Sequence, residues 1–168
     1  MFSGGFFMLY FAYGSNSNWE KMKKIVPSSI FYGKAKLENY RLDFTRESKN
    51  WGCGVADIVE DNKDVWGVIY RFDEEDLGKL DKWEGYSPNR VKNAYKRIEK
   101  MVYLEGKEDQ PMTAYTYEVI DKEFRKHKPN KDYKGLIVTG AKHWKLPKEY
   151  INFLEGIKIQ QRVAMQFK

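Results

Sequence analysis

Glu84 is the acidic side chain whose spacing in the sequence points most directly to chemistry. It follows Leu77 by seven residues and Leu80 by four, so the three side chains share one face of a predicted helix. A carboxylate on an apolar face is desolvated, and desolvation raises its pKa toward the value that suits a general base. The alternative, which the pattern alone favours, is that the helix ends one residue earlier and Glu84 lies on an exposed turn beside Gly85.

The turn Tyr13–Asn16 is a second candidate site. It connects an apolar strand over 6–13 to a short helix, for which Ser17 and Glu20 have the spacing of a capping box. Backbone N–H groups in such a turn, beside the positive end of a helix, bind carboxylates and oxyanions. The alternative is a plain connection, since Gly-Ser-Asn turns are common.

The other reactive side chains lack partners at useful spacing. Cys53 precedes Gly54 at the start of a predicted strand and is interpreted as a packed thiol. His127 and His143 lie in lysine-rich segments without carboxylates at triad or metal-ligand spacing, and are interpreted as surface residues. We therefore expect no metal and no cofactor, and the sequence has no phosphate loop, dinucleotide fingerprint or aromatic RNA-binding motif.

The elements expected to position Glu84 and the turn are mainly strands. The chain has 168 residues and an aromatic fraction of 16%, which favours one β-rich domain spanning 1–168. Because most predicted strands are sequential neighbours, we expect an α+β fold with a mixed, largely antiparallel barrel-like sheet and peripheral helices. After the first strand, the predicted strands cover 30–37, 40–45, 54–60, 65–72, 95–104 and 113–119, and the helices cover 17–25, 74–84, 131–144 and 147–157.

Charge and cysteine content suggest the environment and the partners. The net charge of +6 comes from lysines and arginines that acids interrupt along the whole chain, so it favours attraction of small anions over a nucleic-acid site. A single cysteine is compatible with a reducing compartment, and the cytoplasm is the expected location. The apolar run 6–13 is too short to span a membrane, so no membrane association is expected.

Two motifs together resemble the γ-glutamylcyclotransferase family, including its plant-defence-like and γ-glutamylamine branches. They are Tyr10-Phe11-Ala12-Tyr13-Gly14-Ser15-Asn16 and Leu80-Asp81-Lys82-Trp83-Glu84-Gly85. The similarity runs over nearly the whole chain in the family order, through 41–44, 65–70, 129–133, Gly140-Ala141 and Leu146-Pro147.

This resemblance implies a mixed barrel, often dimeric, that acts on a small γ-glutamyl substrate without a cofactor. Glu84 would be the proton-transferring base, and Tyr133 would contact the glutamyl end of the substrate. The other residues that the resemblance implies for the substrate site are Tyr10, Phe11, Ala12, Tyr13, Gly14, Ser15 and Tyr115. Two departures from the family pattern are Ser17, which replaces an apolar residue, and the long basic segment 86–95, which would stand beside the leaving amine.

The implied chemistry suits these residues. The α-amino nitrogen of a γ-glutamyl amide can close a five-membered ring on the side-chain carbonyl, which releases 5-oxoproline and an amine without an enzyme nucleophile. The predicted activity is therefore cleavage by intramolecular cyclisation. A non-catalytic binding or regulatory member of the same fold is the alternative, and a basic nucleic-acid-binding domain is a third hypothesis that rests on charge alone.

Overall fold

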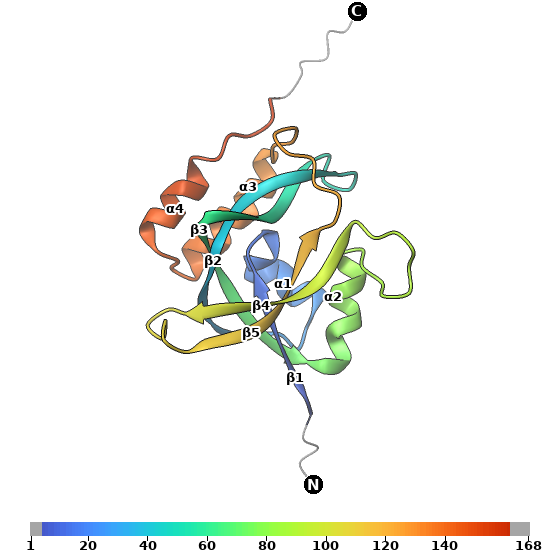
Figure 1. Ribbon diagram of the computed structural model, residues 1–168, viewed down its shortest axis with the longest axis vertical. Coiled ribbons are helices and arrows are strands. Elements are labelled where there is room, and N and C mark those ends of the chain that lie inside the picture. The colour runs from blue at the N-terminus through green and yellow to red at the C-terminus, as the bar shows by residue number, and fades with distance from the viewer. Residues whose placement is uncertain (1–4, 162–168) are drawn as a thin grey trace, which may run out of the picture.

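The computed structural model describes residues 5–161 and contains a closed five-stranded barrel flanked by helices (Figure 1). The strands are β1 (Phe7–Ala12), β2 (Ile30–Ser48), β3 (Cys53–Asp73), β4 (Tyr95–Leu104) and β5 (Pro111–Val119). They follow one another around the barrel in the order β1-β3-β2-β4-β5. All neighbouring pairs are antiparallel except β1 and β5, which are parallel and close the barrel where Tyr10 pairs with Tyr115. The predicted α+β fold with a mixed barrel is therefore confirmed.

Strands β2 and β3 are longer than the sequence predicted. They contain 19 and 21 residues and pair from Ile30 opposite Arg71 to Ser48 opposite Cys53. The segments predicted to be turns near Asn39 and over 61–64 are instead part of these strands. Asn39 has a φ of 62° at a shift in the pairing register, which identifies a bulge. Such bulges bend the two long strands, so one hairpin forms a large part of the barrel wall.

The core fills the barrel with aliphatic and aromatic side chains. Phe11, Ile58 and Tyr70 are among the largest fully buried residues. Gly67 is required here by close packing, because a Cβ at this position would lie 2.5 Å from the Ala12 carbonyl oxygen and 2.7 Å from the Phe11 ring. This contact fixes β1 against β3 directly before the turn that follows β1.

Two short helical segments follow β1. The 3₁₀ turn η1 (Ser15–Ser17) leads into α1 (Trp19–Ile25), whose N-cap is Asn18, because its side chain accepts a hydrogen bond from the Lys21 N–H at 3.1 Å. The predicted capping box at Ser17 is therefore wrong by one residue. Asparagine is as good an N-cap as serine, so the motif alone did not distinguish the two.

The predicted helix over 74–84 is divided into a 3₁₀ turn and an α-helix. These are η2 (Glu74–Asp76) and α2 (Leu77–Trp83), with Glu84 as the C-cap. Gly85 follows with a φ of 67°, the left-handed conformation that glycine commonly adopts after the end of a helix. Glu84 therefore lies directly after the last residue of α2, at the turn that ends the helix.

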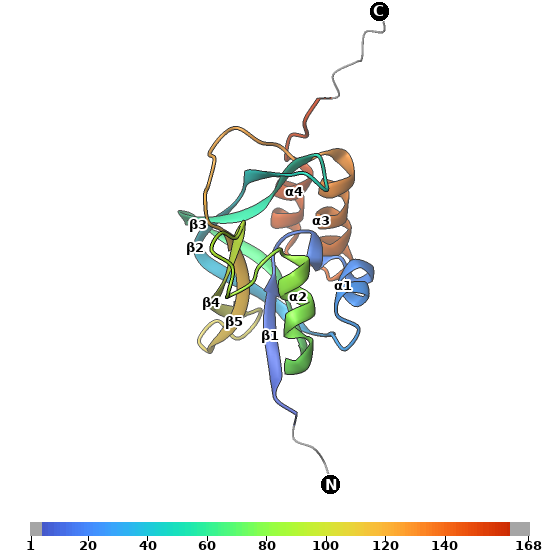
Figure 2. The ribbon, with the colours of Figure 1, turned by 90° about the vertical axis from the view of Figure 1, so that its right-hand side faces the viewer.

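Helices α3 (Lys131–His143) and α4 (Lys148–Glu155) pack against each other, and Figure 2 shows them on the same side of the strands as α1. Helix α3 contacts η1 through Gly140, where a Cβ would lie 2.7 Å from the Ser17 backbone carbon. The Ser17 carbonyl also accepts hydrogen bonds from Trp144 Nε1 at 3.0 Å and from the Tyr70 hydroxyl at 2.9 Å. These contacts hold η1 between the barrel and α3. No helix within residues 5–161 is both long and apolar enough to cross a membrane.

Candidate active site

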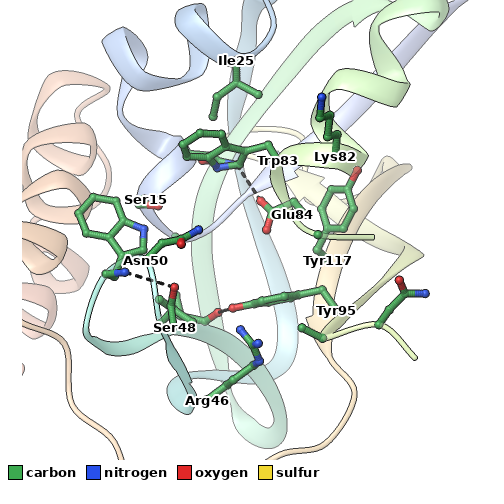
Figure 3. A pocket seen from close by; sticks show the side chains of 18 of the residues that line it. Ser15, Ile25, Arg46, Ser48, Asn50, Lys82, Trp83, Glu84, Tyr95 and Tyr117 are labelled. Atoms are coloured by element: carbon green, nitrogen blue, oxygen red, sulfur yellow. Dashed lines mark hydrogen bonds between the residues drawn. The ribbon is translucent and has the colours of Figure 1, made fainter. Parts of the chain in front are cut away.

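A cavity of about 1140 Å³ lies where η1, the end of α2 and the start of α3 meet the barrel (Figure 3). Its lining includes residues of η1, α1, the β2–β3 turn, the loop before β4, and β5. The segment 86–95 contributes Arg90, Lys92 and Tyr95, so this loop borders the cavity, as the sequence indicated. The residues with candidate roles in chemistry therefore converge on one site from distant parts of the chain.

The side chain of Glu84 lines this cavity, and Figure 3 shows its carboxylate between Trp83 and Tyr117. Its Oε1 accepts a hydrogen bond from Asn16 Nδ2 at 2.8 Å, and the same amide nitrogen also donates to the Tyr10 hydroxyl at 3.1 Å. Desolvation raises the pKa of Glu84 to about 7, although the nearby Lys21 ammonium and the Asn16 hydrogen bond lower it in part. A carboxylate with this pKa can both accept and return a proton near neutral pH.

The η1 turn presents backbone donors beside this carboxylate. Within the described part of the chain, the N–H groups of Ser15 and Asn16 donate no hydrogen bond, as is usual in the first turn of a helix. Gly14 adopts a φ of −107°, so its conformation does not require glycine. The packing around it is tight, because a Cβ at Gly14 would lie 3.0 Å from the Ala56 Cβ and in van der Waals contact, at 3.6 Å, with the Tyr133 hydroxyl.

The Tyr133 ring places its hydroxyl between this turn and the barrel wall. The hydroxyl accepts a hydrogen bond from the Ala56 N–H at 3.0 Å, while the Tyr95 hydroxyl donates to the Ala56 carbonyl at 3.1 Å. Both tyrosines line the cavity and are buried. Strand β3 therefore serves as a rigid support for two polar groups of the site.

Lys21 is a cavity-lining residue that the sequence analysis did not identify. Its ammonium donates a hydrogen bond to Ser15 Oγ and lies 5.3 Å from the centroid of the Trp51 ring and 5.1 Å from that of Trp83. Desolvation lowers the pKa of Lys21 to about 8, and the Glu84 carboxylate opposes this shift. A helical lysine usually indicates a solvated surface, so spacing alone could not have placed this cation in a cavity.

Asp81, one turn before Glu84, is buried and links α2 to the barrel. One carboxylate oxygen accepts a hydrogen bond from the Tyr117 hydroxyl at 2.6 Å, and the other is paired with Arg97. The Tyr117 carbonyl in turn accepts a hydrogen bond from the Tyr13 hydroxyl at 2.5 Å. This network anchors the helix end that carries Glu84.

The structure brings together most of the predicted site residues but not all of them. Those that line the cavity are Glu84, Tyr10, Tyr13, Gly14, Ser15 and Tyr133.

Phe11, Ala12 and Tyr115 were predicted site residues, and they do not line the cavity. Phe11 and Ala12 are fully buried in the core, where the Phe11 ring packs over Gly67. The Tyr115 ring lies on the Arg97 guanidinium, 5.4 Å away, and the neighbouring Tyr117 lines the cavity instead. These three roles were implied by the family resemblance, and no pattern in the sequence indicated which side of each strand faces the cavity.

Cys53 and the two histidines lie outside the cavity lining. Cys53 is buried, in agreement with a packed thiol, and burial raises its pKa. His127 is 3.3 Å from a carboxylate oxygen of the exposed Glu123, and the exposed His143 ring packs edge-on against Trp144.

Comparison with known proteins agrees with this fold and site. The sequence pattern of the AIG2-like family matches residues 64–154, which include β4, β5 and the residue Glu84. Gamma-glutamylcyclotransferase from Bos taurus is 38% identical over 156 residues, which cover 89% of this chain and 78% of the bovine protein. The Homo sapiens protein of the same name is 36% identical over the same extents.

A solved structure named gamma-glutamyl cyclotransferase superimposes with a TM-score of 0.85 at 30% identity, covering 95% of this chain and 92% of the other. The chain therefore belongs to the AIG2-like family, in its γ-glutamylcyclotransferase branch.

Proposed function

We propose that this protein cleaves γ-glutamyl amides by intramolecular cyclisation, releasing 5-oxoproline and a free amine, with Glu84 as the proton-transferring base. The observation that carries the proposal is the Glu84 carboxylate, which lies in the cavity with a pKa of about 7 beside the unused backbone donors of η1. The relatives named gamma-glutamylcyclotransferase support the same reaction.

The first task of the site is to free the nucleophile. The α-amino group of the substrate arrives as an ammonium, which cannot attack a carbonyl until it loses a proton. Glu84, whose side chain lines the cavity, accepts that proton. The nitrogen then attacks the γ-carbonyl carbon and forms the five-membered ring.

The second task is to stabilise the tetrahedral oxyanion that this attack creates. The Ser15 and Asn16 N–H groups are available donors at the start of a helical turn. The Tyr10 hydroxyl is a third candidate, because burial raises its pKa well above the usual value and keeps it protonated. Its oxygen already accepts the Asn16 hydrogen bond, which leaves its own proton free for the substrate.

The last task is to expel the amine. When the bond from the γ-carbon to the departing nitrogen breaks, Glu84 returns its proton to that nitrogen. Glu84 then carries a second proton from the ring nitrogen to the released amine. Of the three protons on the original ammonium, one remains on the ring nitrogen and two leave with the departing ammonium, so the reaction needs no other acid and no oxidant. The positioning of the two ends of one substrate supplies much of the rate enhancement.

The proposal is tested by mass-spectrometric detection of 5-oxoproline with a panel of γ-glutamyl compounds. The panel contains γ-glutamyl amino acids, glutathione, an ε-(γ-glutamyl)lysine peptide and a γ-glutamyl polyamine. Time-dependent release from at least one compound is expected. Tight binding of a compound without any release would instead favour the non-catalytic binding module.

A cytoplasmic homodimer belongs to the same proposal, as the family resemblance implies. Light scattering of the purified protein at assay concentration measures the mass directly. A mass of twice the 20.0 kDa chain is expected.

A further inference from the structure

We propose that Lys21 binds the α-carboxylate of the substrate, so that the amino-acid head group lies between the Lys21 ammonium and the Glu84 carboxylate. This inference rests on the proposed function and adds a specificity-determining residue to it. The site therefore selects γ-glutamyl groups with a free α-carboxylate, and the selecting side chain, Lys21, lies outside the two sequence motifs.

The position of the Lys21 ammonium carries the argument. It donates to Ser15 Oγ, which places it beside the η1 donors, and the faces of Trp51 and Trp83 lie on either side. Within residues 5–161, no carboxylate lies within ion-pair distance of this ammonium, and Ser15 is its one hydrogen-bond acceptor. An ammonium has three donors, so two remain for a ligand in the cavity.

The shape of the substrate fits this arrangement of charge. In a γ-glutamyl group the α-ammonium and the α-carboxylate are attached to the same carbon, so their charged atoms lie about 3 Å apart by standard bond lengths. If the α-ammonium of the substrate contacts Glu84, the α-carboxylate of the substrate must lie within a few ångströms of the Glu84 side chain. Lys21, on α1, and Glu84, at the C-terminal end of α2, both line the cavity, and each influences the pKa of the other.

Other charged and titratable groups around Glu84 do not provide the same partner. Asp81 is committed to Arg97 and Tyr117, and the tyrosine hydroxyls at 10, 13, 95 and 133 are kept neutral by burial. Among the cavity-lining lysines and arginines, Arg46 is the one besides Lys21 that is not exposed. Figure 3 shows its guanidinium near Tyr95, across the cavity from Ser15, so Arg46 is the rival cation.

The test compares two substrates in the same enzyme preparation. One is a γ-glutamyl amide with its free α-carboxylate, and the other is the same compound with an α-carboxamide. The measured quantity is the ratio of their kcat/KM values for amine release. This ratio is independent of the fraction of folded enzyme, and a shift in the Glu84 pKa changes both rates alike.

For the wild-type protein we expect a preference for the carboxylate of about ten- to a hundredfold, the range for a hydrogen bond to a charged group. Lys21→Met should reduce the ratio to within about threefold of one, and Lys21→Arg, which keeps the charge, should retain most of it. Lys23→Met is the matched control, because Lys23 is an exposed lysine of the same helix that does not line the cavity, and it should change the ratio less than twofold.

The possible outcomes separate this inference from the proposed function. If the wild-type protein releases amine but Lys21→Met keeps the wild-type ratio, this inference alone is wrong. It is also overturned if Lys23→Met lowers the ratio equally, which would indicate a general positive field, or if Arg46→Met abolishes the preference while Lys21→Met does not. If the wild-type protein neither releases amine from any γ-glutamyl compound nor binds one, both proposals fail.

Discussion

Replacing Glu84 with glutamine isolates the proton-transfer step from the rest of the site. The glutamine side chain has the same shape, and its carbonyl oxygen can still accept the 2.8 Å hydrogen bond from Asn16 Nδ2. It cannot accept a proton from the substrate ammonium. The fold should therefore persist, and KM should change by less than about tenfold, whereas kcat should fall by a factor of about a hundred to ten thousand.

The magnitude and the pH dependence follow from the environment of Glu84. The expected loss corresponds to about 3–5 kcal/mol of transition-state stabilisation. Because the pKa of Glu84 is about 7, roughly half of the wild-type carboxylates are ionised at neutral pH, and kcat/KM should rise with pH through this region. The glutamine variant has no such group, so its residual activity should lack this rise.

The assay is 5-oxoproline release over substrate concentrations from well below KM to saturation, between pH 5.5 and 8.5, with Glu75→Gln as the matched control. Glu75 is exposed on η2, so the same substitution there should leave kcat within about twofold of the wild-type value. The reasoning is refuted if Glu84→Gln retains more than about a third of the activity, or if its kcat/KM still rises through pH 7.

Three further predictions follow from the same contacts. The pKa of Glu84 is about 7 in the folded protein against an ordinary value of 4.5, so the folded state loses stability as the pH rises between these values. Glu84→Gln should remove this cost and increase stability at pH 8 by up to about 3 kcal/mol in urea unfolding. Asp81→Asn should lower the free energy of unfolding by about 1–3 kcal/mol and kcat by roughly tenfold, because it weakens the pairing with Arg97 and Tyr117 that anchors α2; wild-type stability and turnover would contradict this. Cys53→Ser and excess chelator should each leave turnover within about twofold of the untreated wild type, and a larger loss in a folded sample would indicate a role for the thiol or for a metal.

The sequence predicted the strand-rich fold well because its strong apolar segments have one plausible conformation. The limits of β4 at 95–104 agree with the prediction. The prediction failed where one residue type suits two structures. In β2, Asn39 is as suitable for a bulge as for a hairpin turn, and the polar segment 61–64 has the same ambiguity in β3. The two bent strands were therefore interpreted as four shorter ones.

The site was predictable as far as its motifs extend. The turn after β1 and Glu84 occur in recognisable motifs, and the structure places them on one cavity. Lys21 and Asp81 were missed for a different reason. Charged residues on short helices usually face water, and their burial depends on partners at positions 51, 83, 97 and 117, which the local sequence does not reveal.

The contact between α3 and the η1 turn has a consequence for the order in which the site forms during synthesis. The turn at 15–17 leaves the ribosome early and Glu84 follows, but Tyr133, Gly140 and Trp144, which complete and hold the cavity, are made more than 110 residues after the turn. A nascent chain that ends before α3 contains both sequence motifs and still lacks one wall of the site. Competence to bind substrate should therefore appear late in translation, after the barrel strands have been made and once α3 has packed against η1.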